Sequence, residues 1–171
     1  SKIILKMIPG IDRPAICGAL PSKKGYFHML DLGANVECDA NHLYQFSILG
    51  SALVQSLEIS AKPIVGLLNV GSEEFKGNDT IKKADQLIQK SNINYGGFAE
   101  GDDLFNGKFD VIVTDGFAGN ISLKSIEGVA KFITFFLKQE FNKNILTKLS
   151  AILSYPVMKS VKKKIDPRKY N

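Results

Sequence analysis

The chain has 171 residues, of which 44% are hydrophobic, so it is able to bury one compact core and is not an intrinsically disordered protein. Cys17 and Cys38 form no C-x-x-C pair and are too few for a disulfide framework, which predicts free thiols in a reducing compartment. The first residues lack the pattern of a signal peptide, and no apolar run reaches the roughly 20 residues that span a bilayer. We therefore expect a soluble, cytoplasmic protein.

The net charge of +5 is unevenly distributed along the chain. Residues 1–137 hold 13 Lys and Arg against 15 Asp and Glu, whereas residues 138–171 hold 9 against 2. We expect residues 1–137 to form an α/β domain and residues 138–171 to be its basic helical extension. A basic surface is expected only in the extension. The cluster lacks a nucleic-acid-binding motif and interleaved stacking aromatics, so we expect no nucleic-acid partner.

The first half of the chain predicts a helix end, two strands and a helix. Residues 1–8 resemble the last turns of an apolar helix that Pro9-Gly10 stops. Residues 15–20 and 26–32 are apolar runs separated by a turn around residues 21–25, which indicates neighbouring strands. Asp39 or Asn41 is expected to cap the helix that follows. Its buried face is predicted from apolar residues at steps of three and four: Leu43, Phe46, Gly50, Leu53 and Leu57.

The second half alternates strands and helices. Residues 64–70 form a continuous apolar run, which is typical of a strand covered on both faces, and residues 93–98 and 110–114 are further strand candidates. Between the first two lies a polar helix, and its predicted inward residues are Ile81, Ala84, Leu87 and Ile88. This alternation favours a mostly parallel sheet flanked by helices. A long helix over residues 121–141, a break at 142–144 and a second apolar segment over residues 145–153, which reaches Pro156, predict a C-terminal helical hairpin.

Three polar, glycine-containing loops follow predicted strands, at residues 31–35, 71–79 and 114–120. In a parallel sheet such loops gather at the carboxyl edge, where ligands bind and where helix N-termini favour anions. The last loop belongs to the stretch VIVTDGFAGNISLK, which reads as strand, loop and helix start. Turn and cap chemistry explains any one loop; three together indicate one ligand-binding edge. The candidates are Asp31, Asn35, Glu73, Lys76, Gly77, Asn78, Asp115, Gly116, Gly119, Asn120 and Lys124.

Several familiar signatures are missing from the sequence. The Gly71 loop has no GK[ST] ending and there is no G-x-S-x-G, which argues against a P-loop and a serine hydrolase. With only His28 and His42 present, we expect no metal site and no cofactor, although His42 lies near enough to its helix start to reach the edge. The phrase MLDLGAN resembles the first motif of S-adenosylmethionine-dependent methyltransferases, which is the alternative enzyme class. The acidic residue expected at the end of the next strand is missing, because that strand ends in LNVG.

Taken together, five segments resemble the phosphate acyltransferase family of bacterial phospholipid synthesis. They are IPGIDRPAI, LDLGANVECDANHLYQFSILGSA, VGLLNVGSEEFKGND, EGDDLF and VIVTDGFAGNISLKSIEG. The resemblance implies a fold related to phosphotransacetylases and isocitrate dehydrogenase-like enzymes, acting as a homodimer. It also implies transfer of a fatty acyl group from acyl carrier protein to inorganic phosphate, which gives an acyl phosphate for glycerol-3-phosphate acylation. On this basis Lys76, Asn78 and Asp115 are the catalytic candidates and the remaining loop residues the substrate-binding ones.

The same resemblance predicts that the chain is a fragment. Family members are about twice as long and contain an Asp-Ala-Met-Gly-Gly-Asp loop and a Gly-Asn-Thr-Gly loop that this sequence lacks. A catalytically incompetent remnant that only folds or dimerises is therefore a second alternative. The basic, apolar helical end suits either dimerisation or docking on an anionic membrane surface near a membrane glycerol-3-phosphate acyltransferase, and both possibilities stay open at this point.

Overall fold

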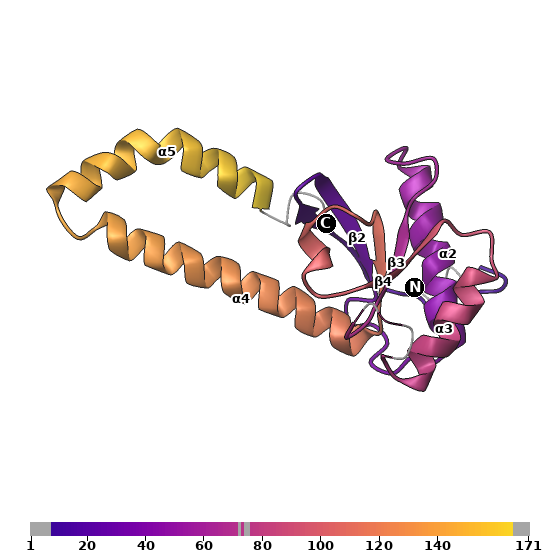
Figure 1. Cartoon of the computed structure of the whole chain (residues 1–171). Helices are drawn as coiled ribbons and strands as arrows, with labels where there is room; N and C mark the ends of the chain where they lie inside the picture. Colours follow the sequence, from indigo (N-terminus) through magenta and orange to yellow (C-terminus); the bar gives the residue numbers. More distant parts are fainter. Residues whose placement is uncertain (1–7, 72, 74–75, 166–171) are drawn as a thin grey trace.

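The computed structural model describes residues 8–71, 73 and 76–165. Within this part, a five-stranded sheet runs in the order β1-β2-β5-β3-β4, and only β1 is antiparallel to its neighbour (Figure 1). The mostly parallel sheet flanked by helices is therefore confirmed. The elements are β1 (Cys17–Ser22), β2 (Gly25–Leu30), α2 (Ala40–Ser56), β3 (Val65–Leu68), α3 (Asp79–Gln89), β4 (Tyr95–Ala99), η1 (Asp103–Phe105), β5 (Val111–Val113), α4 (Gly116–Phe141) and α5 (Ile145–Ile165).

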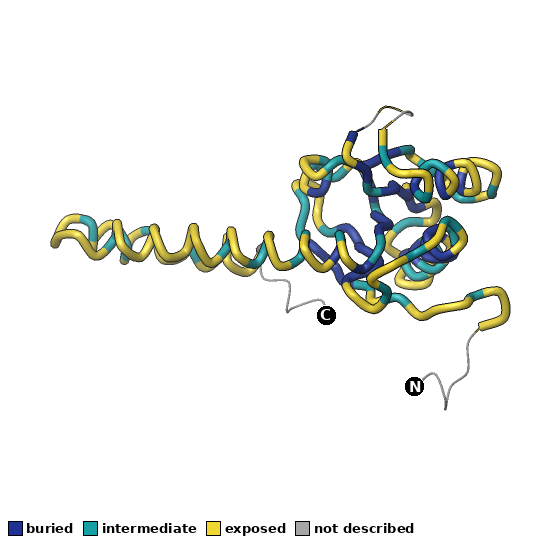
Figure 2. The backbone as a smooth tube through the Cα atoms, turned by 90° about the horizontal axis from the view of Figure 1, so that it is seen from below, coloured by how far each residue is buried: buried dark blue, intermediate teal, exposed yellow. Residues whose placement is uncertain are grey.

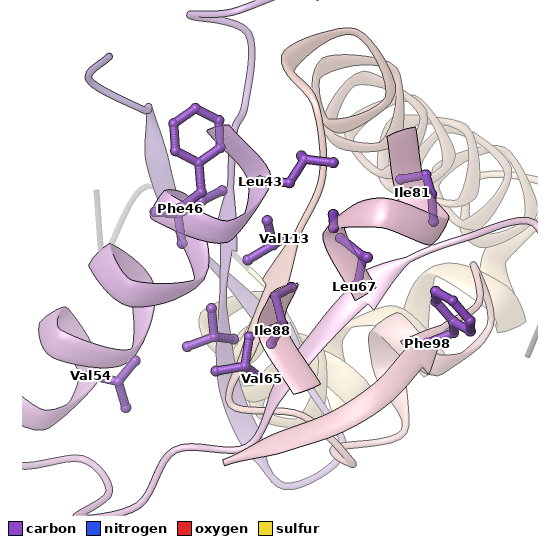
Figure 3. Packing of buried hydrophobic residues seen from close by; sticks show 12 residues of the cluster. Leu43, Phe46, Val54, Val65, Leu67, Ile81, Ile88, Phe98 and Val113 are labelled. Carbon is purple, nitrogen blue, oxygen red and sulfur yellow. The ribbon is translucent and has the colours of Figure 1, made fainter. Parts of the chain in front are cut away.

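Helices α2 and α3 cover one face of the sheet. Apolar side chains from both helices meet the alternate residues of β3 and β5 that point toward them, as Figure 3 shows for Leu43, Ile88, Val65 and Val113. The opposite face is packed by η1, by Phe109 and by the first turns of α4. Because both faces are covered, the parallel strands are continuously apolar, as the sequence predicts.

Most element positions agree with the prediction, and the differences follow from local chemistry. Strand β1 continues across Pro21 to Ser22, which an edge strand tolerates because its outer N–H groups need no partner. Asp39, and not Asn41, caps α2: the His42 N–H donates to Asp39 Oδ1 (2.9 Å). The predicted N-terminal helix lies outside the described residues, except for Ile8, which is not helical.

Three predicted core residues are less buried than expected. Leu53 is half-buried, Leu57 is 53% exposed and Leu87 is 36% exposed. Near the end of α2, Val54 is buried in place of the predicted Leu53. The helix face that packs on the sheet is therefore offset there by one residue from the predicted one. The pattern of apolar residues marks a wide stripe, and the sheet covers only part of it.

Helices α4 and α5 form the predicted hairpin, which extends away from the sheet and returns toward it (Figure 1). Helix α5 runs beyond the predicted apolar segment and contains Pro156, which removes one helical hydrogen bond but does not end the helix. Near its end, the Tyr26 hydroxyl donates to the Lys164 carbonyl (3.5 Å). None of the described helices is both long and apolar enough to cross a membrane.

Candidate functional site

The three polar loops leave three adjacent strands of the sheet. Strands β2, β5 and β3 are neighbours and parallel, with Leu30 beside Val113 and Val113 beside Leu67. The loops that follow them therefore start at the same edge, and the N-termini of α3 and α4 begin there. The gathering of the loops that the sequence predicts is confirmed for the backbone. Such an edge offers backbone N–H groups and positive helix ends to an anion.

Asp31 organises the first loop from inside. Its side chain is fully buried, and Oδ1 accepts hydrogen bonds from the backbone N–H groups of Ile16 (2.9 Å), Gly33 (3.2 Å) and Ala34 (3.1 Å). Oδ2 accepts from the backbone N–H (2.6 Å) and the side-chain amide (2.8 Å) of Asn35. The Asn35 amide also donates to the Pro14 carbonyl (2.8 Å). Both predicted site residues thus hold the loop in shape.

The first loop packs tightly against the start of α4. The Gly116 N–H donates to the Asn35 carbonyl (2.7 Å), and a Cβ on Gly116 would lie 2.6 Å from that oxygen. A Cβ on Gly119 would overlap the Asp31 carbonyl oxygen. The two glycines allow two backbones to approach one another, and neither faces open space. Gly33, at φ +124°, lies beside Asn120.

Helix α4 begins five residues earlier than predicted. Asp115 is its N-cap, since the Ala118 N–H donates to Asp115 Oδ1 (2.7 Å), and Gly116 is already helical. Asn120 is therefore in the second turn, where it is exposed, and Lys124 lies a further turn along, paired with Glu127 (3.0 Å). The glycines suggested a loop, but the cap and the close packing against the first loop stabilise a helix there.

Lys76 gives the second loop its positive charge. Its Nζ lies 2.8 Å from Glu73 Oε2, and the aliphatic part of the side chain lies over Gly71, at the place where a Cβ would be. This hydrogen bond raises the pKa of Lys76 and lowers the pKa of Glu73. Both side chains are exposed, so an anion is able to compete with the carboxylate for the ammonium group.

Sequence reasoning missed Asn69, which is 9% exposed directly after β3. Its amide nitrogen donates to the carbonyls of Gly71 (3.0 Å) and Lys76 (3.2 Å), and its oxygen accepts from the Val70 N–H (2.9 Å). Gly77, at φ +90°, packs against the same oxygen. The signal was a polar residue inside the apolar run LLNV, which is costly to bury without partners. Asn78 then caps α3 through the Ile81 N–H (2.9 Å).

His42 belongs to the N-terminal cap of α2. It is 9% exposed, and its Nδ1 accepts a hydrogen bond from the Asp39 N–H (3.2 Å) in a capping box. Among the described residues, His, Cys, Asp and Glu side chains form no group of three able to hold a metal ion. A surface hollow of about 410 Å³ lies away from the three loops, between the second half of α2 and residues 90–93.

The family model described as "Fatty acid synthesis protein" matches residues 1–171. The chain belongs to this family. Curated relatives named phosphate acyltransferase are 53% identical in Methylococcus capsulatus, over 100% of this chain and 50% of the relative, and 54% identical in Hydrogenovibrio crunogenus, over 100% and 51%. The resemblance read from the five motifs is confirmed. The chain spans about half the length of these relatives.

The fold of this chain is similar to that of solved phosphotransacetylase structures. The EutD phosphotransacetylase from Staphylococcus aureus superimposes with a TM-score of 0.63 at 18% identity, covering 76% of this chain and 46% of that one. A phosphotransacetylase from Streptococcus pyogenes gives 0.57 at 16% identity, covering 75% and 45%. The predicted relation to the phosphotransacetylase fold is confirmed. At these identities the likeness concerns the fold alone.

Proposed function

We propose that this chain carries one wall of the active site of a phosphate acyltransferase, which moves a fatty acyl group from acyl carrier protein to inorganic phosphate. A phosphate oxygen attacks the thioester carbonyl carbon and forms the new C–O bond. The C–S bond then breaks, and the carrier leaves as a thiolate that takes up a proton. The products are an acyl phosphate and the free carrier thiol, and the reaction needs no cofactor.

The observation that carries this proposal is the meeting of three loops and two helix N-termini at one edge, beside an exposed lysine. Phosphate attack needs its negative charge to be held and oriented, and the thioester oxygen needs donors as charge develops on it. The positive N-terminal ends of α3 and α4 together with Lys76 supply both in this proposal, without a covalent enzyme intermediate. The match with relatives named phosphate acyltransferase supports this reaction over methyl transfer.

Each residue has a role in the proposal that fits its contacts. Lys76 exchanges Glu73 for phosphate, and Asn120 contacts the same anion from α4. Asn78 and Asp115 act as caps that aim the N-termini of α3 and α4 at the reactants. The other candidates shape the edge or lie at its rim: Asp31, Asn35, Gly77, Gly116, Gly119 and Lys124.

The decisive assay is phosphate-dependent release of thiol from acyl carrier protein, run on this chain and on the chain extended to the length of its relatives. Activity of the extended protein that falls at least about a hundredfold in Lys76→Ala, with Lys62→Ala unchanged, supports the proposal, since one ion pair to a transferring group is worth several kcal/mol. Lys62 lies shortly before β3 begins at Val65, at the opposite end of that strand from Lys76. Turnover by the extended protein that ignores phosphate would refute the reaction. Turnover only after extension would show that this chain by itself is a remnant.

We also propose that the α4–α5 hairpin joins two copies of the chain. Its apolar residues are highly exposed, for example Phe132 at 62% and Leu153 at 81%, and Figure 2 shows exposed positions along almost the whole hairpin. An apolar surface of this kind is expected to be buried against a partner in water, here a second copy of the chain. Sedimentation should give a dimer, which Leu153→Asp dissociates and Leu57→Asp, at the exposed C-cap residue that follows α2, does not. A monomeric wild type that floats with anionic vesicles would instead assign the hairpin to a membrane surface.

A further inference from the structure

We propose that Asn69 is a positioning residue that fixes Lys76 at the carboxyl edge, so that phosphate affinity depends on a side chain that never touches the phosphate. This inference rests on the proposed function, because it concerns the same loop. Its first evidence is the pair of hydrogen bonds from one buried amide to the carbonyls of Gly71 (3.0 Å) and Lys76 (3.2 Å). They join residues five apart and therefore close the loop at its base.

The geometry leaves Asn69 little freedom. Its side-chain oxygen accepts from the Val70 N–H (2.9 Å), so the amide plane is held from both ends. Gly77 packs against that oxygen, and any side chain at position 77 would overlap it. An asparagine supplies two donors and one acceptor at this reach, which is the set that these three backbone groups require.

The closed loop determines where the ammonium group of Lys76 lies. With its carbonyl tied to Asn69, Lys76 runs back over Gly71, and a Cβ on Gly71 would lie 3.0 Å from Nζ and 2.9 Å from Glu73 Oε2. A free lysine side chain samples many rotamers, so fixing it in advance reduces the entropy that binding an anion costs. Gly71 thus leaves room for the Lys76 side chain, and Asn69 fixes the backbone from which that side chain extends.

Two variants test this inference by different routes. Asn69→Leu keeps the approximate side-chain volume but removes both hydrogen bonds that the amide donates. Gly71→Ala acts directly on Lys76, because the new Cβ would occupy the place of its side chain, which is flexible enough to move aside. Asn94→Leu is the control for the first, since the Asn94 amide donates to the Lys62 carbonyl (3.0 Å) at the opposite edge. Gly101→Ala is the control for the second, because a Cβ there meets open space.

The first readout does not need a ligand. In this chain, NMR titration of the Lys76 side chain should show its raised pKa falling toward that of an ordinary lysine in Asn69→Leu and Gly71→Ala, with both controls unchanged. A general loss of stability in a chain that is still folded would not shift this one pKa. An unchanged Lys76 pKa in a folded Asn69→Leu variant would overturn the inference.

The second readout is titration of the chain with inorganic phosphate, followed by the amide signals of Lys76 and Gly77. We expect affinity to fall at least about tenfold in both variants, the equivalent of one charge-assisted hydrogen bond. Wild-type affinity in Asn69→Leu would also overturn the inference. If wild type shows no response to phosphate while the Lys76 pKa still falls in Asn69→Leu, the phosphate role of the loop fails and the positioning of Lys76 by Asn69 stands.

Discussion

Replacing Asp31 by Asn should destabilise the whole domain, because this carboxylate is the buried centre of the first loop. Of its two oxygens, Oδ2 is the less costly one to convert to an amide nitrogen, since it accepts only the two donations from Asn35. Two charge-assisted hydrogen bonds at about 1.5–3 kcal/mol each amount to about 3–6 kcal/mol. Asn35 is half-buried and recovers part of this by turning to water, so we expect a loss of about 3 kcal/mol.

Urea unfolding at pH 7, followed by circular dichroism, measures this loss. The midpoint should fall while the slope with denaturant stays unchanged, since the native surface is the same. Asp102→Asn is the matched control: Asp102 is exposed and its side chain makes no capping hydrogen bond, so its effect should stay within about 0.5 kcal/mol. A change below about 1 kcal/mol in Asp31→Asn would show that the five contacts contribute little.

Three further outcomes are expected from single sites. Gly119→Ala should cost about 1–3 kcal/mol in urea unfolding by overpacking the first loop, whereas Gly128→Ala, in the same helix with open space around it, should gain up to about 1 kcal/mol. Burial lowers the pKa of His28, so unfolding free energy should fall as pH drops below 6.5, where the unfolded chain binds the proton more tightly; a His28→Gln variant should show a flatter pH profile. Burial raises the pKa of both Cys17 and Cys38 to about 11, so iodoacetamide at pH 8 should react more slowly with the folded chain than with the chain in urea.

The position of the candidate site could be predicted because it follows from strand direction. Apolar runs followed by Gly, Asp and Asn place loops at strand ends, and parallel strands bring those ends to one edge. The cap of α3 at Asn78 could also be predicted locally, since a cap involves residues only three apart, whereas the cap of α4 at Asp115 was missed because the helix was expected to begin at residue 121.

The internal support of the site could not be predicted in the same way. Asp31 accepts a hydrogen bond from the Ile16 N–H, which lies in a separate segment. Position 119 requires a glycine because a Cβ there would overlap the carbonyl oxygen of Asp31. These contacts join residues distant in sequence, so no local pattern records them. The predicted loop over residues 114–120 was wrong for the same reason, because packing against the first loop favours helix from Gly116 onward.

The sequence by itself determined the strand and helix alternation, the polar loops and the family, because periodicity, caps and motif wording are local properties. The tertiary structure decided which loop residues face outward and which hold the loops in place. Lys76 and Asn120 stay exposed, whereas the side chains of Asp31 and Asn69 are buried and form hydrogen bonds with backbone groups of the loops. The physical reason is that a buried polar group is stable only with partners, and only the folded chain brings those partners within reach.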